Sequence, residues 1–402
     1  MITAMIRCVV AILSRRSLIA FIFLSLVFWP MGAEALAADD DDTPEPLPVD
    51  RRCLARLDGC GGAFVAFSRD GSRVVTADEK DARVWDARTF EPLTPALHHG
   101  ARLTVAALCD NGRVALTCGG WEAYGKDGKW TSHGNGARVW DCDGGRQLMY
   151  VAAHGKHPVL DAAVSPDGLF IAACAVDDRT VRIWEIARGK TMREIACRGS
   201  VRSVVFNPTG IGLLTIGQST QQWNYQTGLR IGDTDAHGAA RGIYTRDGRI
   251  FIVSGYSFYA TYEAKTGKEI DVEENIEGAT RSSLHVAASD NGKIAALRGD
   301  LYVTSVWDID IGLPLRTKMK HVGLEVAVVS PDGELALVDG VDANAGIWDL
   351  AARKLIQKLD TGGRCGQIFS AGCFSPNGTQ VAVASGLSTY IWKVQADKPT
   401  AK

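Results

Sequence analysis

Residues 159–185 read VLDAAVSPDGLFIAACAVDDRTVRIWE, and this stretch decides the fold. An apolar run leads into the turn Ser165-Pro166-Asp167-Gly168, a second apolar run follows, and a short loop precedes a third run centred on Trp184. Proline presets φ in such a turn, the Asp side chain accepts backbone hydrogen bonds, and glycine takes the positive φ. The stretch therefore predicts a strand, a hairpin turn, a second strand, a loop and a third strand.

The same block recurs along the chain, and its turn occurs eight times. The turns are Ser68–Gly71, Cys109–Gly112, Ser165–Gly168, Asn207–Gly210, Thr245–Gly248, Ser289–Gly292, Ser330–Gly333 and Ser375–Gly378. A strand-centred aromatic residue follows each turn, at Trp85, Trp140, Trp184, Trp223, Tyr262, Trp307, Trp348 and Trp392. The mean spacing of these blade aromatics is about 44 residues, a period typical of β-propeller blades. We expect each of them to be a structural residue buried between neighbouring blades.

Four of the blade aromatics begin the dipeptide Trp-Asp, and the chain resembles the WD40 family from residue 51 to residue 395. The resemblance implies a β-propeller with four antiparallel strands in each blade. WD40 members commonly link a His, a Ser or Thr, an Asp and the Trp in a hydrogen-bonded tetrad. In this chain His99, His154, His237 and His321 lie near the family position but are often shifted. We therefore expect mostly incomplete tetrads, and stability that comes chiefly from apolar packing.

The last blade lacks an outer strand, because only a short segment follows Trp392 before a polar tail. Residues 52–58 alternate polar and apolar side chains as a half-buried strand does, and they precede the first turn. Pairing this strand with the strand of Trp392 would close the ring and cover two exposed edges. The predicted fold is an all-β, eight-bladed WD40/YVTN-like propeller closed by an N-terminal strand. Seven blades is the alternative, should the blade around Tyr262 be irregular.

The N-terminus has the pattern of a signal peptide. Arg15 and Arg16 precede an uncharged run from Ser17 to Met31, and Ala35-Leu36-Ala37 then precedes four aspartates. Two alternatives stay open: an uncleaved membrane anchor, and a twin-arginine signal around the two arginines. The predicted divisions are a signal peptide at 1–37, an acidic and proline-rich linker at 38–50, the propeller at 51–395 and a polar tail at 396–402. They imply export to the periplasm, the cell envelope or the extracellular medium.

Composition excludes several function classes. A net charge of −2 and a pI near 6.5 create no field that attracts a polyanion, so we expect no nucleic-acid binding. Nine cysteines follow the signal peptide without Cys-x-x-Cys pairs, which is typical of neither a disulfide framework nor a zinc site. We expect no metal and no cofactor, a monomer, a protein partner, and membrane contact only through an uncleaved leader.

Motifs of catalysis are missing as well. The chain has no Gly-x-Ser-x-Gly nucleophile elbow, no His-Glu-x-x-His and no dinucleotide-binding glycine pattern. We therefore predict a non-catalytic, secreted interaction scaffold. The alternative is a propeller enzyme or cofactor binder similar to the quinoprotein dehydrogenases. Residues 262–268 of this chain resemble the repeat of that family. Against this alternative, the Trp that the quinoprotein repeat carries after its Thr-Gly does not follow Thr266-Gly267. The chain also has no two adjacent cysteines.

Two features predict where a partner binds. The first blade spacing is 55 residues instead of about 44, and the excess falls in a predicted loop at 118–134. This loop carries three aromatic residues, Trp121, Tyr124 and Trp130, which could anchor a partner or fold back on the loop itself. Four arginines lie near the start of a blade's first strand, namely Arg102, Arg202, Arg241 and Arg281. They would form a partial basic ring for an anionic group of the partner, or remain independent solvated arginines.

Overall fold

The computed structural model describes residues 53–395, apart from 125–129, 153–156, 256–257, 275–285, 291–293, 298–302, 309–312, 315–318, 321–326, 342–343, 353 and 361–368. The predicted signal peptide, linker and tail lie outside the described residues. Every regular element that is described is a β-strand. In this part of the chain, no helix has the length and apolar character needed to cross a bilayer.

The strands form eight antiparallel sheets, which we number along the chain. The first is β2 (Phe64–Phe67), β3 (Arg73–Ala77), β4 (Asp81–Asp86) and β5 (Leu97–His98). The second is β6 (Leu103–Leu108), β7 (Val114–Tyr124), β8 (Trp130–Asp141) and β9 (Gln147–Val151). The third is β10 (Val159–Val164), β11 (Phe170–Ala175), β12 (Thr180–Glu185) and β13 (Lys190–Ala196). The fourth is β14 (Val201–Phe206), β15 (Gly212–Gly217), β16 (Ser219–Asn224) and β17 (Arg230–His237).

The second half of the chain repeats this arrangement. The fifth sheet is β18 (Arg241–Tyr244), β19 (Ile250–Ser254), β20 (Phe258–Glu263) and β21 (Glu269–Glu274). The sixth is β22 (Val286–Ala288), β23 (Ile294–Leu297), β24 (Val303–Asp308) and β25 (Leu313–Pro314), with β26 (Met319–Lys320) also pairing with β24. The seventh is β27 (Ala327–Val329), β28 (Leu335–Val341), β29 (Asn344–Asp349) and β30 (Lys354–Leu359). The eighth is β31 (Phe369–Phe374), β32 (Gln380–Ser385), β33 (Ser388–Lys393) and β1 (Cys53–Asp58).

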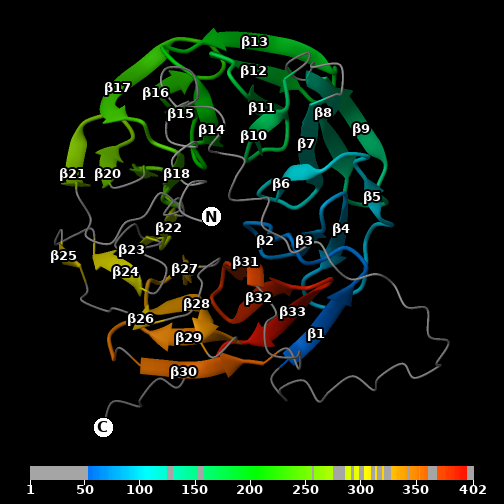
Figure 1. Cartoon of the computed structure of the whole chain (residues 1–402), viewed down its shortest axis with the longest axis vertical. Coiled ribbons are helices and arrows are strands. Elements are labelled where there is room, and N and C mark those ends of the chain that lie inside the picture. Colours follow the sequence, from blue (N-terminus) through cyan, green and yellow to red (C-terminus); the bar gives the residue numbers. More distant parts are fainter. Residues whose placement is uncertain are drawn as a thin grey trace, which may run out of the picture. The chain divides into compact units, whose positions relative to one another are not determined.

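One strand of each sheet, its inner strand, contacts the inner strands of the neighbouring sheets (Figure 1). These contacts run in chain order through β2, β6, β10, β14, β18, β22, β27 and β31, and β31 contacts β2 in turn. The outer strand of the eighth sheet is β1, which pairs antiparallel with β33. Leu57 lies opposite Thr389, and Cys53 lies opposite Trp392. The two ends of the described chain therefore share one sheet.

The hairpin turns join each inner strand to the next strand of its sheet. Six turn glycines have φ between 66° and 77°, namely Gly71, Gly112, Gly168, Gly248, Gly333 and Gly378. Gly210 is not among the positive-φ glycines, so the expectation of a left-handed glycine in every turn is wrong there. The reason is Asn207, whose side-chain oxygen accepts the backbone N–H of Thr209 at 2.9 Å. This Asx turn closes the chain without a left-handed residue.

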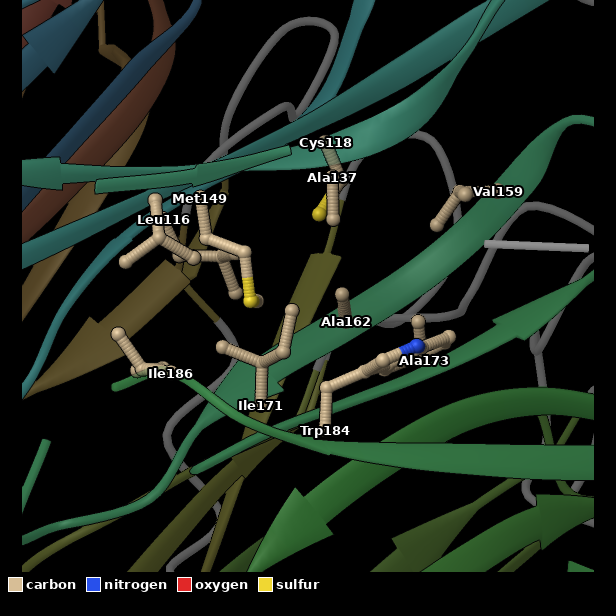
Figure 2. Close-up of a cluster of buried hydrophobic side chains, with 11 residues drawn as sticks. Leu116, Cys118, Ala137, Met149, Val159, Ala162, Ile171, Ala173, Trp184 and Ile186 are labelled. Atoms are coloured by element: carbon tan, nitrogen blue, oxygen red, sulfur yellow. The ribbon is translucent and has the colours of Figure 1, made fainter. Parts of the chain in front are cut away.

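Apolar clusters fill the space between neighbouring sheets. Figure 2 shows the cluster between the second and third sheets, where Trp184 and Ile171 face Leu116 and Met149. The blade aromatics at Trp85, Trp140, Trp184, Trp223, Tyr262 and Trp392 are all buried. Trp348 is half-buried, and Trp307 lies in β24. Burial of a large aromatic side chain stabilises a fold by roughly 3–5 kcal/mol on the truncation scale, so this packing holds adjacent sheets together.

No disulfide joins any of the eight cysteines in the described part of the chain. Five of them are buried, at Cys60, Cys109, Cys118, Cys142 and Cys174. Burial raises the pKa of each of these thiols, so that thiolate is scarce near neutral pH. These cysteines pack as small apolar side chains. Cys8 and Cys365 lie outside the described residues.

Candidate functional site

The insertion in the second sheet is an extended hairpin, so the loop predicted at 118–134 is wrong. β7 and β8 continue to pair until Tyr124 lies opposite Trp130, and only 125–129 at the tip lie outside the described residues. The physical reason is local: aromatic residues and Thr131 favour extended backbone, and two extended segments on the same hairpin satisfy each other's hydrogen bonds. Trp121 lies opposite His133 in this register.

The hairpin extends beyond the four-stranded body of its sheet. The inner strand β6 pairs with β7 only as far as Gly119, and the outer strand β9 pairs with β8 from Ala137 onward. Residues 121–124 and 130–133 therefore pair only with each other. Among the described strands, none pairs with the outer edges of this two-stranded ribbon, and an isolated two-stranded hairpin is marginally stable in water.

The base of this ribbon touches the start of the inner strand β6. The backbone N–H of Gly120 donates to the carbonyl oxygen of Arg102 at 3.0 Å. A Cβ atom on Gly119 would lie 2.2 Å from the same carbonyl oxygen, which excludes any side chain there. Only glycine permits this close approach of two backbones. The ribbon and the start of β6 therefore lie at the same end of the second sheet.

Three of the four predicted arginines lie in the described chain, each at the start of an inner strand. Arg102 is exposed and directly precedes β6, Arg202 is half-buried in β14, and Arg241 is the exposed first residue of β18. They belong to the second, fourth and fifth sheets. Arg281 lies outside the described residues. The structure thus places the three arginines near the starts of three inner strands, at register positions that differ from one strand to the next.

A buried carboxylate beside Arg241 was not foreseen from the sequence. Asp161 of β10 accepts a hydrogen bond from the Ser203 hydroxyl at 2.5 Å. It also accepts the backbone N–H groups of Val204 at 3.1 Å and of Ala162 at 3.0 Å. The Arg241 guanidinium lies 3.9 Å away. Through these contacts one side chain of the third sheet joins the inner strands of the fourth and fifth sheets.

The electrostatics of this cluster leave Arg241 partly available. Burial raises the pKa of the Asp161 carboxyl, while Arg241, Ser203 and the two backbone donors act in the opposite direction. The Asp161 side chain is 11% exposed, whereas that of Arg241 is 54% exposed. A guanidinium has five N–H donors, and its contact to Asp161 is long. Arg241 can therefore engage a second carboxylate that approaches from solvent.

A signal for Asp161 was present in the sequence. It is the one charged residue within the apolar run of residues 159–164, at a position that the strand pattern assigns to the interior. A charged residue is rarely buried unless it is paired, so its place predicts a partner. The identity of that partner, a serine 42 residues away and an arginine 80 residues away, has no local signature.

Among the described residues, no group of three or more His, Cys, Asp or Glu side chains is arranged to hold a metal ion. The Asp161 cluster joins a serine hydroxyl, a carboxylate, two backbone N–H groups and a guanidinium, and none of these described groups is an imidazole that could take a proton from the serine. Its chemistry is that of hydrogen bonding and charge pairing.

Comparison with known proteins relates one repeat and the fold of the chain to WD40 domains. The model of the WD domain, G-beta repeat, matches residues 145–185. Among solved structures, the C-terminal WD40 domain of Sif2 superimposes with a TM-score of 0.67, covering 86% of this chain and 98% of that one at 14% identity. The described chain has the fold of a WD40 domain. The computationally designed Ika8 protein superimposes with a TM-score of 0.65 over 85% of this chain and all of its own length, at 17% identity.

A curated relative matches a shorter part of the chain. Small ribosomal subunit protein RACK1y of Oryza sativa subsp. japonica is 39% identical over 93 residues, which is 23% of this chain. The chain spans about a quarter of the length of that relative, because the match covers 26% of it. The likeness therefore concerns the repeat, and it establishes a WD40 repeat within an all-β chain of antiparallel sheets.

Proposed function

We propose that this chain is an exported, non-catalytic scaffold that binds an acidic segment of a protein partner. The binding face carries the β7–β8 ribbon together with Arg102, Arg202 and Arg241. WD40 repeat proteins are typical protein-interaction scaffolds, which supports the general class. The observation that carries the specific proposal is Arg241, which lies beside Asp161 at the start of the inner strand β18 while more than half of its side chain faces solvent.

The scaffold we propose is an eight-bladed propeller closed by β1. Eight sheets whose inner strands contact one another in a cycle support the blade number. The pairing of β1 with β33 supports the closure, because it covers the edge of the last sheet with residues from the start of the domain. A rigid ring of this kind would hold the three arginines at constant separations, as recognition of an extended acidic segment requires.

The partner we propose is a protein and not an RNA. The rice relative is named as a ribosomal subunit protein, but this chain has a net charge of −2, and RNA binding draws most of its affinity from a basic surface. The basic groups that the binding face does contain are few and separate, and they suit individual carboxylates. The leader at 1–37 supports an exported location.

The experiment that tests this proposal combines partner capture with thermal melting. Replacing Trp121 and Trp130 by alanine should weaken capture from the envelope fraction of the native host at least tenfold, because aromatic anchors commonly contribute about 2 kcal/mol or more each. The free energy of unfolding should change by no more than about 0.5 kcal/mol, as for other surface substitutions. A lower melting temperature with intact capture would assign both indoles to the core and move the binding face elsewhere.

A second variant tests the charge. Arg241→Gln should weaken capture, and added salt should reduce the remaining difference between this variant and the parent chain, because screening removes the same interaction. The matched control is Arg188→Gln, which removes an exposed arginine paired with Glu185 at 3.1 Å in the turn between β12 and β13. Equal capture by all three proteins would contradict the role of Arg241.

A further inference from the structure

The hairpin turns show a repeat that is four sheets long. Their second residues, taken in chain order, are Arg69, Asp110, Pro166, Pro208, Arg246, Asp290, Pro331 and Pro376. The series Arg, Asp, Pro, Pro thus occurs once in the first four sheets and again in the last four. Proline suits this turn position in general, so the arginines and aspartates need another explanation.

Arg69, in the turn of the first sheet, reaches three other sheets. Its Nη1 donates to Asp110 Oδ2 at 2.8 Å in the second sheet, and to the carbonyl oxygen of Pro208 at 3.0 Å in the fourth. Its Nη2 donates to the carbonyl oxygen of Arg246 in the fifth. One side chain therefore holds backbone and carboxylate groups of turns that lie up to 177 residues away.

Arg246 makes the same three contacts from the other half of the chain. Its Nη1 donates to Asp290 Oδ2 at 2.5 Å in the sixth sheet, and to the carbonyl oxygen of Pro376 at 3.3 Å in the eighth. Its Nη2 donates to the carbonyl oxygen of Arg69 at 3.3 Å. Each arginine thus binds the aspartate one sheet onward, a proline carbonyl three sheets onward, and the backbone of its counterpart four sheets onward.

We propose that Arg69 and Arg246 form a reciprocal clasp that fastens the first four sheets to the last four across the axis that the inner strands surround. The first and fifth sheets are four steps apart in either direction around the cycle of inner-strand contacts. Two groups in such sheets can meet only by crossing the axis. Beyond the main chain itself, the clasp joins six of the eight turns through hydrogen bonds and ion pairs.

The clasp is reached by solvent but carries no net charge. The side chains of Arg69 and Arg246 are 28% and 38% exposed, and two aspartates balance the two arginines. Arg69, Arg246 and Asp290 also line a cavity of about 230 Å³ together with inner-strand residues such as Phe67, Val328 and Phe374. The arginine carbonyls and proline carbonyls fix where each guanidinium lies, because planar guanidinium groups bond in defined directions. The role of the clasp is therefore to hold the turns in place, and its guanidinium groups are already paired with carboxylates.

Hydrogen exchange of the full mature chain, measured by mass spectrometry, tests the clasp. Arg69→Ala and Arg246→Ala should each raise amide exchange at least tenfold in the turns of both halves, including those at Asp110 and Asp290, because each variant breaks the link between halves. The control is Arg249→Ala, which lies in the fifth sheet's turn, pairs with Asp247 at 2.6 Å and is 83% exposed. Faster exchange confined to the half that carries the substitution would overturn the proposal.

Variants that retain the charge keep the test informative if the alanine variants fail to fold. Arg69→Lys and Arg246→Lys preserve the positive charge, but the lysine ammonium group cannot hold three acceptors in the directions of a guanidinium. The double variant should raise exchange less than the product of the two single effects, because both arginines serve one shared link. Exchange equal to the parent chain in both single variants would show that the directed guanidinium bonds do not restrain the turns. Strictly multiplicative effects in the double variant would show two independent ion pairs. Either outcome would overturn the proposal. Neither result depends on a partner.

Discussion

Thr117 joins two buried side chains of the second sheet. Its hydroxyl lies 3.0 Å from His99 Nδ1, and it accepts the indole N–H of Trp140 at 2.8 Å. Thr76 and Thr215 accept the indole N–H groups of Trp85 and Trp223 in the same way. Each of these hydrogen bonds stabilises the fold because a buried indole N–H without an acceptor costs roughly 1–3 kcal/mol. Threonine on the second strand thus supplies the acceptor for the indole N–H in the first, second and fourth sheets.

His99 should make stability depend on pH. The residue is 1% exposed, and burial, aided by the positive charge of Arg138, lowers its pKa to about 4. The unfolded chain, with a pKa near 6.5 at this residue, binds a proton at a higher pH than the folded chain does. Its contribution is therefore fully present above pH 6.5 and is lost as pH falls toward 4, by up to about 3 kcal/mol.

Urea denaturation at pH 7 and at pH 4.5 measures this effect. The variant His99→Gln lacks the titrating group but shares every other ionisable group with the parent chain. The parent should therefore lose about 2 kcal/mol more than the variant between these two pH values. An equal loss in both proteins would show that His99 is protonated in the folded chain.

At the scale of elements, β1 and the β7–β8 ribbon differ in how their strand edges are paired. β1 covers the edge of β33, and its Leu57 is buried beside Trp85 and Ile391. The ribbon instead extends beyond its own sheet, where neither β6 nor β9 follows it. An edge that is covered contributes to stability, whereas an extension that is not covered is free to serve recognition.

Removing β1 should destabilise the whole domain. A chain that starts at Cys60 loses the burial of Leu57 and exposes the edge of β33, so we expect the melting temperature to fall by about 5 °C or more, with lower solubility. The control starts at Arg51 and differs only by residues 51–59. Equal melting and solubility of the two chains would show that the pairing of β1 with β33 contributes nothing to the fold.

At the scale of the whole molecule, the chain has two kinds of organisation with different periods. The 44-residue repeat builds one sheet at a time, and each sheet buries its faces against its neighbours. The fourfold longer repeat of turn residues places the two arginines where they can meet. In a repeat array, each unit is usually stabilised only by contacts with its immediate neighbours. The clasp adds contacts between sheets that are not adjacent.

The proposed export would determine the N-terminus of the mature molecule. Cleavage after Ala37 should leave a mature N-terminus at Ala38, because the small-x-small pattern ends there and the acidic run follows directly. The intact mass of the protein isolated from its native host measures this. A mass that includes residues 1–37 would favour the uncleaved membrane anchor over the exported, soluble form.

The sequence by itself determined the strand order, the turns and the identity of the blade aromatics. These features depend on local chemistry: proline, Asx residues and glycine define a turn within four residues, and alternating apolar residues define a strand. The period of the Trp residues then predicts how many such units the chain contains. Even so, Gly210 and the loop predicted at 118–134 were misjudged, because an Asn side chain and cross-strand pairing supplied hydrogen bonds that composition does not reveal.

Only the tertiary structure decided which distant residues meet. Asp161 meets Ser203 and Arg241, and Arg69 meets Arg246, because bending successive sheets around a common axis brings inner strands and turns together. Such contacts depend on the summed geometry of every sheet between the two partners. A charged residue in an apolar strand, or an arginine where a proline is usual, signals that a partner exists. The physical reason that local sequence cannot name the partner is that the contact depends on how all the intervening sheets are arranged in space.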